Sequence, residues 1–193
     1  NGMVPQDKMQ DFSGRIYHES ERLSNLVADI IQLSRLDEKN GETMFEPVDI
    51  SELGEDVINN LQNRAAKKKI SLEYTGNPAL VQGVRHVLYE MFYNITDNAI
   101  RYTSEGGTVK VFVGKFNGKP YFRVEDNGIG IPESEQQRIF ERFYRVDKSH
   151  SRETGGTGLG LSIVKHGAVL HHAKILLDSE PGQGTKMEIL FNN

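Results

Sequence analysis

Two asparagines and an arginine lie along one side of a helix that the sequence predicts at residues 84–102. Asn94 and Asn98 are four residues apart and Arg101 follows by three, so they share one polar stripe beside an apolar one. Asparagine is a mediocre helix former, and an amide oxygen can bind a magnesium ion held mainly by phosphates and water. The stripe predicts a magnesium and phosphate site in which Arg101 approaches phosphate oxygens, although a solvated helix face would give the same pattern.

A second segment, DNGIGI at residues 126–131, follows a predicted strand. The Asp126 carboxylate can accept a hydrogen bond from an exocyclic amine such as that of adenine. Gly128 and Gly130 allow the backbone to come close to a flat ring. A strand-ending turn is the alternative, since Asn-Gly is a common turn pair.

A third segment, GGTGLGL at residues 155–161, leads directly into a helix, and the amides at a helix N-terminus attract phosphate. No Gly-Lys-Ser/Thr follows, so the segment is not a P-loop, and the dinucleotide fingerprint would need glycine at Leu161 or Ile163. A flexible linker is the alternative for this segment alone. Together with FERFYR at residues 140–145, the segments fall between residues 90 and 161 and indicate a nucleotide site.

Composition excludes several other classes of function. The chain has 193 residues, 37% hydrophobic and 26% charged, which is typical of a soluble globular domain with an extension. A net charge of −4 gives no support to nucleic-acid binding, and the lack of cysteine excludes disulfides, thiolate zinc sites and thiol nucleophiles. No apolar run approaches the roughly 18 residues of a membrane span. Because the chain begins at Asn1 without methionine, we expect a fragment, with any membrane anchor outside it.

A long helix is predicted at residues 6–38, before a break at residues 37–41 that ends in glycine. Its apolar residues repeat every seven positions, with one of the two series interrupted at Glu19. Such a seam needs a partner helix to bury it, and packing of the helix on its own domain is the alternative. We therefore divide the chain into a partial dimerisation domain at residues 1–43 and a catalytic domain at 44–193. The seam consists of Phe12, Ile16, Leu23, Leu26, Val27, Ile30, Ile31 and Leu33.

The remaining pattern predicts an α+β fold: a two-layer α/β sandwich, with helices on one face of a mixed, mostly antiparallel sheet, preceded by the long helix. The basic run Lys67–Lys69 at a helix end is interpreted as solvated. Residues 141–156 are polar and aperiodic, and are expected to form a flexible loop. Helices are expected at 51–68, 84–102, 132–139 and 159–170, and strands at 45–50, 70–74, 108–116, 121–125, 174–177 and 185–191.

The segments and their order resemble the ATP-binding catalytic part of bacterial two-component sensor histidine kinases, within a superfamily that also contains gyrase and a heat-shock chaperone. The resemblance covers nearly the whole chain and implies ATP and Mg²⁺ as cofactors. It implies that Asn98 ligates the metal, that Asn94 and Arg101 act at the phosphates, that Tyr102 packs on the nucleotide and that Asp126 reads adenine.

The same resemblance implies a lid over the nucleotide at residues 140–156, with Arg145 near phosphate and Thr185 contacting adenine through water. The further residues that it places at the nucleotide are Gly128, Gly130, Ile131, Phe140, Arg145, Gly156, Thr157, Gly158, Leu159, Gly160 and Thr185.

One position separates transfer from hydrolysis. The hydrolytic members carry a water-activating glutamate one turn before the magnesium asparagine, and this chain has Asn94 there. An amide cannot take a proton, so we expect phosphoryl transfer to another acceptor, which depends mainly on positioning and charge neutralisation.

The expected acceptor is a histidine on the first helix of a dimeric two-helix hairpin, in a His-Glu motif followed shortly by Thr-Pro. His18-Glu19 lacks Thr-Pro, and residues 19–37 resemble the hairpin's second helix instead. We therefore expect the acceptor helix to be missing and this fragment to be unable to label itself. The resemblance also implies a homodimer in the full-length protein, relay of the phosphoryl group to a response regulator aspartate, and a cytoplasmic place in a bacterial inner-membrane sensor.

Two alternatives remain open. A serine kinase of the anti-sigma type would use the same ATP fold, but the long helix with its apolar seam argues against it. A non-catalytic ATP-sensing scaffold would explain the fold, but all four segments are intact.

The histidines at 166, 171 and 172 cluster near the end of the last helix. We interpret them as a helix end of cationic character rather than as a metal site. His172-Ala173 stands where the family has a glycine pair, so we expect a non-glycine residue in a left-handed conformation there.

Overall fold

The computed structural model describes residues 44–146 and 157–192, together with nine positions between residues 13 and 31. All nine early positions are helical, in agreement with the expected long helix. Four of them are apolar and lie on the predicted seam, and their side chains are 49% to 61% exposed. The nine positions are Ser13, Gly14, Ile16, Glu19, Ser20, Leu23, Ser24, Val27 and Ile31. The other seam residues, Phe12, Leu26, Ile30 and Leu33, lie outside the described residues.

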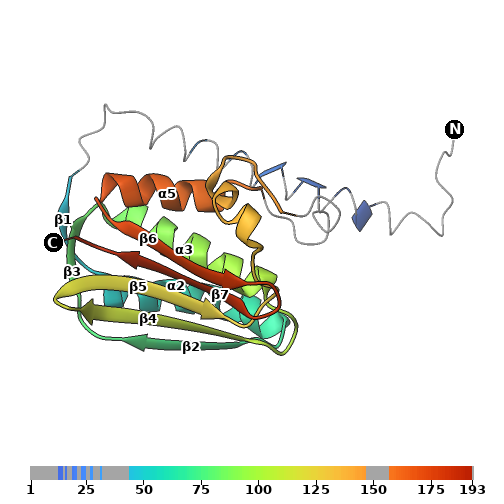
Figure 1. Ribbon diagram of the computed structural model, residues 1–193, viewed down its shortest axis with the longest axis horizontal. Helices are drawn as coiled ribbons and strands as arrows, with labels where there is room; N and C mark the ends of the chain where they lie inside the picture. The colour runs from blue at the N-terminus through green and yellow to red at the C-terminus, as the bar shows by residue number, and fades with distance from the viewer. Residues whose placement is uncertain are drawn as a thin grey trace, which may run out of the picture.

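The centre of the molecule is a five-stranded sheet with the strand order β2-β4-β5-β7-β6 (Figure 1). Strand β2 is parallel to β4, and the other pairs are antiparallel. The predicted mixed, mostly antiparallel sheet is therefore confirmed. The strands are β2 (Ser71–Gly76), β4 (Thr108–Phe116), β5 (Lys119–Asp126), β6 (Lys174–Glu180) and β7 (Gly184–Leu190).

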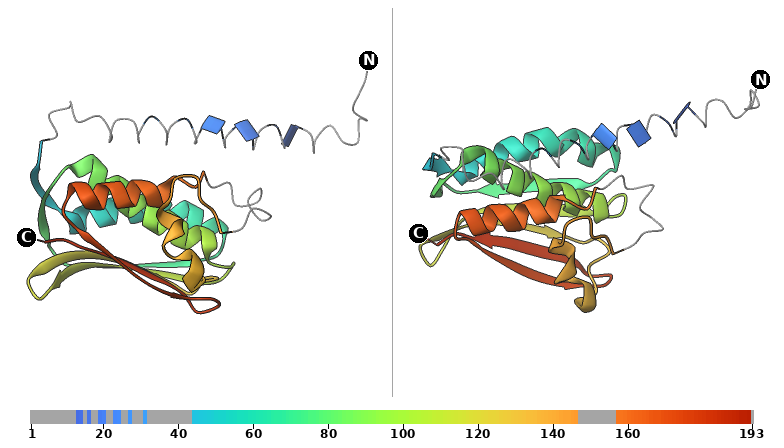
Figure 2. Two further views of the ribbon diagram at one scale, coloured as in Figure 1. Left: turned by 45° about the horizontal axis from the view of Figure 1, so that its top comes forward. Right: turned by 90° about the horizontal axis from the view of Figure 1, so that it is seen from above.

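Three helices cover one face of this sheet and make the second layer (Figure 2). They are α2 (Ile50–Lys67), α3 (Arg85–Tyr102) and α5 (Gly160–Leu170). Each begins within one residue of its predicted start. No described helix is long and apolar enough to cross a membrane.

Two details differ from the prediction. A short strand β3 (Leu80–Gly83) pairs with β1 (Glu46–Asp49) in a separate two-stranded sheet, and β3 was not predicted. The helix expected at 132–139 is instead two 3-10 turns, η2 (Glu133–Glu135) and η3 (Arg138–Phe140).

The core lies between the helices and the inner face of the sheet. Phe92 of α3 stacks on Phe122 of β5 with ring centroids 3.9 Å apart, and Phe191 meets Phe92 edge-on. All three rings are at most 1% exposed. Burial of such rings is a large apolar contribution, and it fixes α3 over the centre of the sheet. This packing fixes the position of the polar stripe of α3 relative to the strands.

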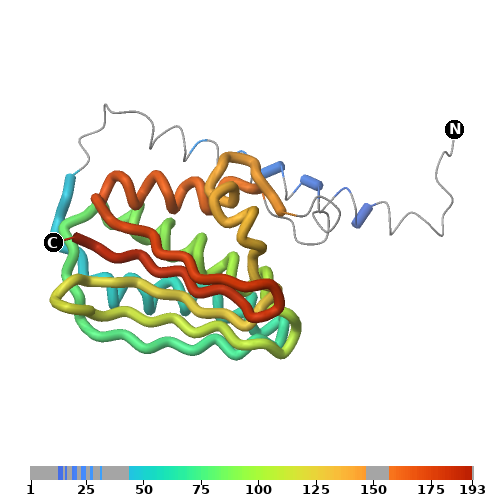
Figure 3. Tube along the Cα trace, viewed as in Figure 1, coloured from blue at the N-terminus to red at the C-terminus, as the bar shows by residue number. Residues whose placement is uncertain are grey.

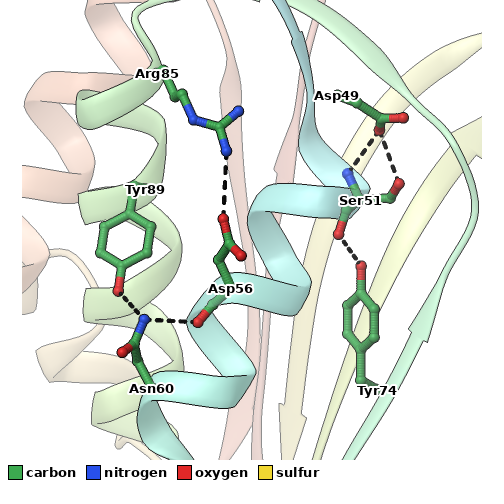
Figure 4. A network of polar contacts seen from close by, with 7 residues as sticks. All are labelled: Asp49, Ser51, Asp56, Asn60, Tyr74, Arg85 and Tyr89. Carbon is green, nitrogen blue, oxygen red and sulfur yellow. Dashed lines mark hydrogen bonds and ion pairs between the residues drawn. The ribbon is translucent and has the colours of Figure 1, made fainter.

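Polar contacts fix α2 beside α3 and β2 (Figure 4). Asp49 caps α2 by accepting the Ser51 N–H at 2.9 Å. The Tyr74 hydroxyl on β2 donates to the Ser51 carbonyl. The Asn60 amide donates to the Tyr89 hydroxyl of α3 at 3.0 Å. The helix that carries the candidate site is thus supported from its side as well as from below.

The end of α5 confirms one expectation and corrects another. His172 has φ of +51°, the left-handed conformation expected there. His171 is 5% exposed, and its Nε2 accepts the Val84 N–H at 3.0 Å while its Nδ1 lies 2.7 Å from the Gly167 carbonyl. Burial lowers the pKa of His171. The expected cationic character is therefore wrong for this ring, because an Nε2 that accepts a hydrogen bond carries no proton.

Candidate functional site

The polar stripe of α3 meets the start of α5. Asn94 donates its amide N–H to the Glu90 carbonyl at 2.8 Å, so its side chain lies along the helix. A Cβ added to Gly160 would come within 2.6 Å of Asn94 Oδ1, so a larger residue there would require the Asn94 side chain to move. The structure thus brings together the asparagine helix and the glycine-rich segment. Asn94 and Asn98 are both half-buried.

Asp126 ends strand β5 with an ordered carboxylate. Its Oδ1 accepts the Gly128 N–H at 2.8 Å and the Thr185 N–H at 3.3 Å. Oδ2 has no hydrogen bond to the part of the chain that the structure describes, and is therefore available to accept an exocyclic amine. Burial raises the pKa of Asp126, and the two backbone N–H groups partly offset this by lowering it.

Protein backbone fills the space beside the two glycines of the 126–131 loop. A Cβ at Gly128 would lie 2.5 Å from the Tyr102 carbonyl oxygen, and Ile129 donates its N–H to that same oxygen at 3.2 Å. Gly130 has φ of +68°, and a Cβ there would lie 1.9 Å from the Glu180 carbonyl oxygen. The glycines therefore allow this loop to pack tightly between α3 and the turn after β6. Their role beside an adenine ring stays a prediction.

Ser179 links three parts of the same loop region, and sequence reasoning missed it. Its hydroxyl accepts the Ile131 N–H at 2.9 Å, donates to the Gly184 carbonyl at 2.9 Å and lies 2.9 Å from the Thr185 hydroxyl. The Gln136 amide donates to the carbonyls of Ser179 and Ile131 at 2.8 and 3.1 Å. These contacts join the predicted residues Ile131 and Thr185 in one network with Ser179 and Gln136. No local sequence pattern indicates the role of Ser179, because its hydrogen bonds join residues far apart in the chain.

The two ends of the expected lid meet at Phe143 and Gly158. Phe143 donates its N–H to the Gly158 carbonyl at 2.9 Å, and both residues have positive φ. A Cβ on Gly158 would lie 2.8 Å from the Phe143 carbonyl carbon, so glycine is needed for this closure. The Tyr144 hydroxyl donates to Glu135, which anchors the lid's first residues. Figure 3 shows the residues around 140–146 beside the start of α5.

The other predicted lid residues are placed as follows. Phe140 and Arg145 are half-buried, and Phe140 packs against the core. Leu159 is 1% exposed, and the Thr157 hydroxyl accepts its N–H at 3.3 Å. Gly156 and residues 147–155 lie outside the described residues. The approach of Arg145 to phosphate stays a prediction.

Arg101 is held by a carboxylate of its own helix. Its guanidinium lies 3.0 Å from Asp97 Oδ2, and the two side chains are only 14% and 10% exposed. Arg64 of α2 approaches the other oxygen of Asp97 at 2.5 Å. Next to Arg101, Tyr102 is 39% exposed at the end of α3. A contact of Arg101 with phosphate, and of Tyr102 with the nucleotide, stays a prediction.

The candidate site consists of residues from one side of α3, the start of α5 and the loop after β5. A comparison with known protein families shows which family contains these segments. Residues 83–193 match the family described as histidine kinase-, DNA gyrase B-, and HSP90-like ATPases. The chain belongs to this ATPase family. The three segments that carry Asn94, Asp126 and Gly158 all fall inside the matched region. Membership implies that this ATPase domain binds ATP.

Similar proteins extend the likeness to most of the chain. The sensor-like histidine kinase SenX3 of Mycolicibacterium smegmatis is 38% identical over 181 residues, which is 93% of this chain and 47% of SenX3. The chain thus spans about half the length of this relative. The structure of the mycobacterial sensor histidine kinase MprB aligns with a TM-score of 0.67 and 30% identity, covering 76% of this chain and 96% of that one. Full-length ShkA in complex with AMPPNP aligns with a TM-score of 0.77 and 25% identity, covering 99% of this chain and 40% of ShkA.

Proposed function

We propose that residues 44–193 bind Mg-ATP and donate its γ-phosphate to a histidine that lies outside residues 1–193. The observation that carries the proposal is the meeting of Asn94 with the N-terminus of α5 at Gly160. Phosphate is favoured where helix amides point outward, and here that helix start faces an amide side chain rather than a carboxylate. An amide cannot deprotonate water, so this arrangement supports transfer over hydrolysis.

The adenine end of the proposed ligand would lie at Asp126. A carboxylate with one oxygen bound to backbone and the other available can accept the exocyclic amine of adenine. The AMPPNP complex named for ShkA is a supporting likeness from a protein that is 25% identical.

The metal would be held mainly through the nucleotide. Among the described residues, no group of three or more His, Cys, Asp or Glu side chains could hold a metal ion. Half-buried Asn98 offers one amide oxygen, a donor type that suits Mg²⁺ when phosphates and water complete the shell. When bound, the metal would neutralise phosphate charge during transfer. Asn94 would support the same phosphates from one turn earlier.

We propose that residues 1–43 are the second helix of a dimerisation hairpin, next to a catalytic domain at 44–193. The exposed apolar side chains at Ile16, Leu23, Val27 and Ile31 support this, because they would be covered by neighbouring helices. The full-length protein would be a homodimer that passes phosphate to a response regulator, with this part in the cytoplasm. Because the match to SenX3 includes most of the N-terminal region, a serine kinase that has only the ATP fold is disfavoured.

A transfer assay tests the proposal. The protein is incubated with Mg²⁺ and γ-labelled ATP, alone and with an added polypeptide that carries the preceding helix of the natural protein. We expect label only on the added polypeptide, stable in base and lost in acid. Acid-stable label would instead indicate a serine kinase, and absence of label despite ATP binding would indicate a scaffold. Strong self-labelling that survives His18→Ala would contradict the separate acceptor.

A further inference from the structure

Lys68 follows the end of α2 and reaches the end of α3. The basic run Lys67–Lys69 was interpreted as solvated, but this is wrong for Lys68, which is half-buried. Its ammonium group donates to three backbone carbonyls, at 2.9 Å to Ile100, 2.8 Å to Arg101 and 2.7 Å to Thr103. An ammonium has three donors, so these contacts use all of them.

The four carbonyls at residues 100–103 all have partners from outside α3. Helix ends leave the last carbonyls without intrahelical partners. Lys68 binds three of them, and the Ile129 N–H of the 126–131 loop binds the fourth, that of Tyr102. The last turn of α3 is therefore held by both Lys68 and the 126–131 loop. Loss of either contact would allow this turn to fray.

Charge supports the same arrangement. The C-terminal end of a helix carries partial negative charge, which a cation stabilises. The side chain of Arg101 is held through Asp97 one turn earlier, and its backbone carbonyl is held through Lys68. Burial lowers the pKa of Lys68, and the nearby charges of Arg64 and Arg101 lower it further. Among the described residues, the partners of the ammonium are these carbonyls and no carboxylate.

We propose that Lys68 is a positioning residue for the nucleotide: by fixing the carbonyls of the last turn of α3, it holds Tyr102 and the 126–131 loop in the geometry that binds adenine. The inference rests on the proposed function, because it concerns the same site. Lys68 lies before the region that matches the ATPase family, which begins at residue 83.

The test is titration calorimetry of Mg-ATP binding to the Lys68→Met variant, at low temperature where the variant is folded by circular dichroism. Methionine keeps an unbranched apolar side chain and removes the ammonium. Lys67→Met is the matched control, because it is the same substitution one residue away and Lys67 is exposed. Lys68→Arg tests rescue, because a guanidinium can also donate to several carbonyls.

We expect Lys68→Met to bind about tenfold more weakly at unchanged stoichiometry, which corresponds to about 1.4 kcal/mol. Lys67→Met should bind as the natural protein does, and Lys68→Arg should recover most of the affinity. Partial unfolding alone would lower the stoichiometry instead. Wild-type affinity in Lys68→Met would overturn the inference, and if that variant does not fold, wild-type affinity in Lys68→Leu, which also lacks a hydrogen-bond donor, would overturn it equally. Absence of ATP binding by the natural protein would refute the proposed function itself.

Discussion

Replacement of Asp126 by asparagine tests the adenine assignment with little disturbance of the fold. The Oδ1 atom that accepts the N–H groups of Gly128 and Thr185 is retained in asparagine, so both internal hydrogen bonds can persist. The available Oδ2 becomes an NH₂ group, which would face the amine of adenine as donor against donor. Because burial disfavours the charged carboxylate, the neutral amide should leave the free energy of unfolding nearly unchanged.

The loss of one hydrogen bond to a charged acceptor is about 1.5–3 kcal/mol. At about 1.4 kcal/mol for each factor of ten, we expect ATP to bind roughly 10- to 150-fold more weakly to Asp126→Asn. Titration calorimetry measures the affinity, and thermal unfolding checks the fold. Asp178→Asn on β6 is the matched control, because its side chain is exposed and the charge change is the same. An Asp126→Asn protein that is folded and binds ATP as tightly as the natural protein would refute the assignment.

Three further predictions concern backbone and protonation. Gly130→Ala and Gly118→Ala both place alanine at positive φ, which costs about 1–2 kcal/mol, but only at Gly130 would the new Cβ also meet a carbonyl oxygen, at 1.9 Å. Chemical denaturation should therefore show a larger loss of unfolding free energy for Gly130→Ala than for Gly118→Ala. Equal losses would contradict the close packing at Gly130. His172→Gly removes a strained φ of +51° and should raise stability by about 1 kcal/mol, seen as a Tm increase of about 2–4 °C; an unchanged Tm would mean that the strain is absent. Because the folded pKa of His171 lies below the ordinary 6.5, its contribution to stability is complete above that value and is lost as pH falls through the folded pKa. Urea unfolding at about pH 7.5 and about pH 5.5 should show a larger loss in the natural protein than in His171→Gln, and identical losses would contradict the assigned neutral ring.

The helices and most strands could be predicted because their signals are local. Apolar spacing marks α3, glycine marks the start of α5, and alternation marks β4 and β5. The left-handed residue at His172 was also predictable, since a helix end without glycine must use another residue there.

The features that sequence reasoning missed depend on partners far away in the chain. Strand β3 has only four residues and is defined by its pairing with β1. The expected helix at 132–139 divides into two turns in a segment where Gln136 bonds to Ile131 and Ser179. Lys68 is the middle one of three consecutive lysines whose neighbours are exposed, so the sequence does not distinguish it. Only the packing of α2 against α3 brings its ammonium to the carbonyls of α3.

The segments of the candidate site could be chosen from the sequence, but the contacts of their residues could not, and the role of each residue at a nucleotide stays a prediction. Asp126 and Asn94 are marked by unusual residue types beside glycine or inside a helix. That Gly128 and Gly130 pack against the Tyr102 and Glu180 carbonyls could not be read from spacing, because two distant loops must first meet.

The most direct test of the central claim is a comparison of ATP and GTP binding to the natural protein in the presence of Mg²⁺. We expect saturable ATP binding with a Kd between about 1 μM and 1 mM. Guanine presents a carbonyl where adenine presents its amine, so it would face the Asp126 carboxylate as acceptor against acceptor, and GTP should bind at least about tenfold more weakly. Absence of ATP binding, or GTP binding of equal strength, would contradict an adenine nucleotide site at Asp126.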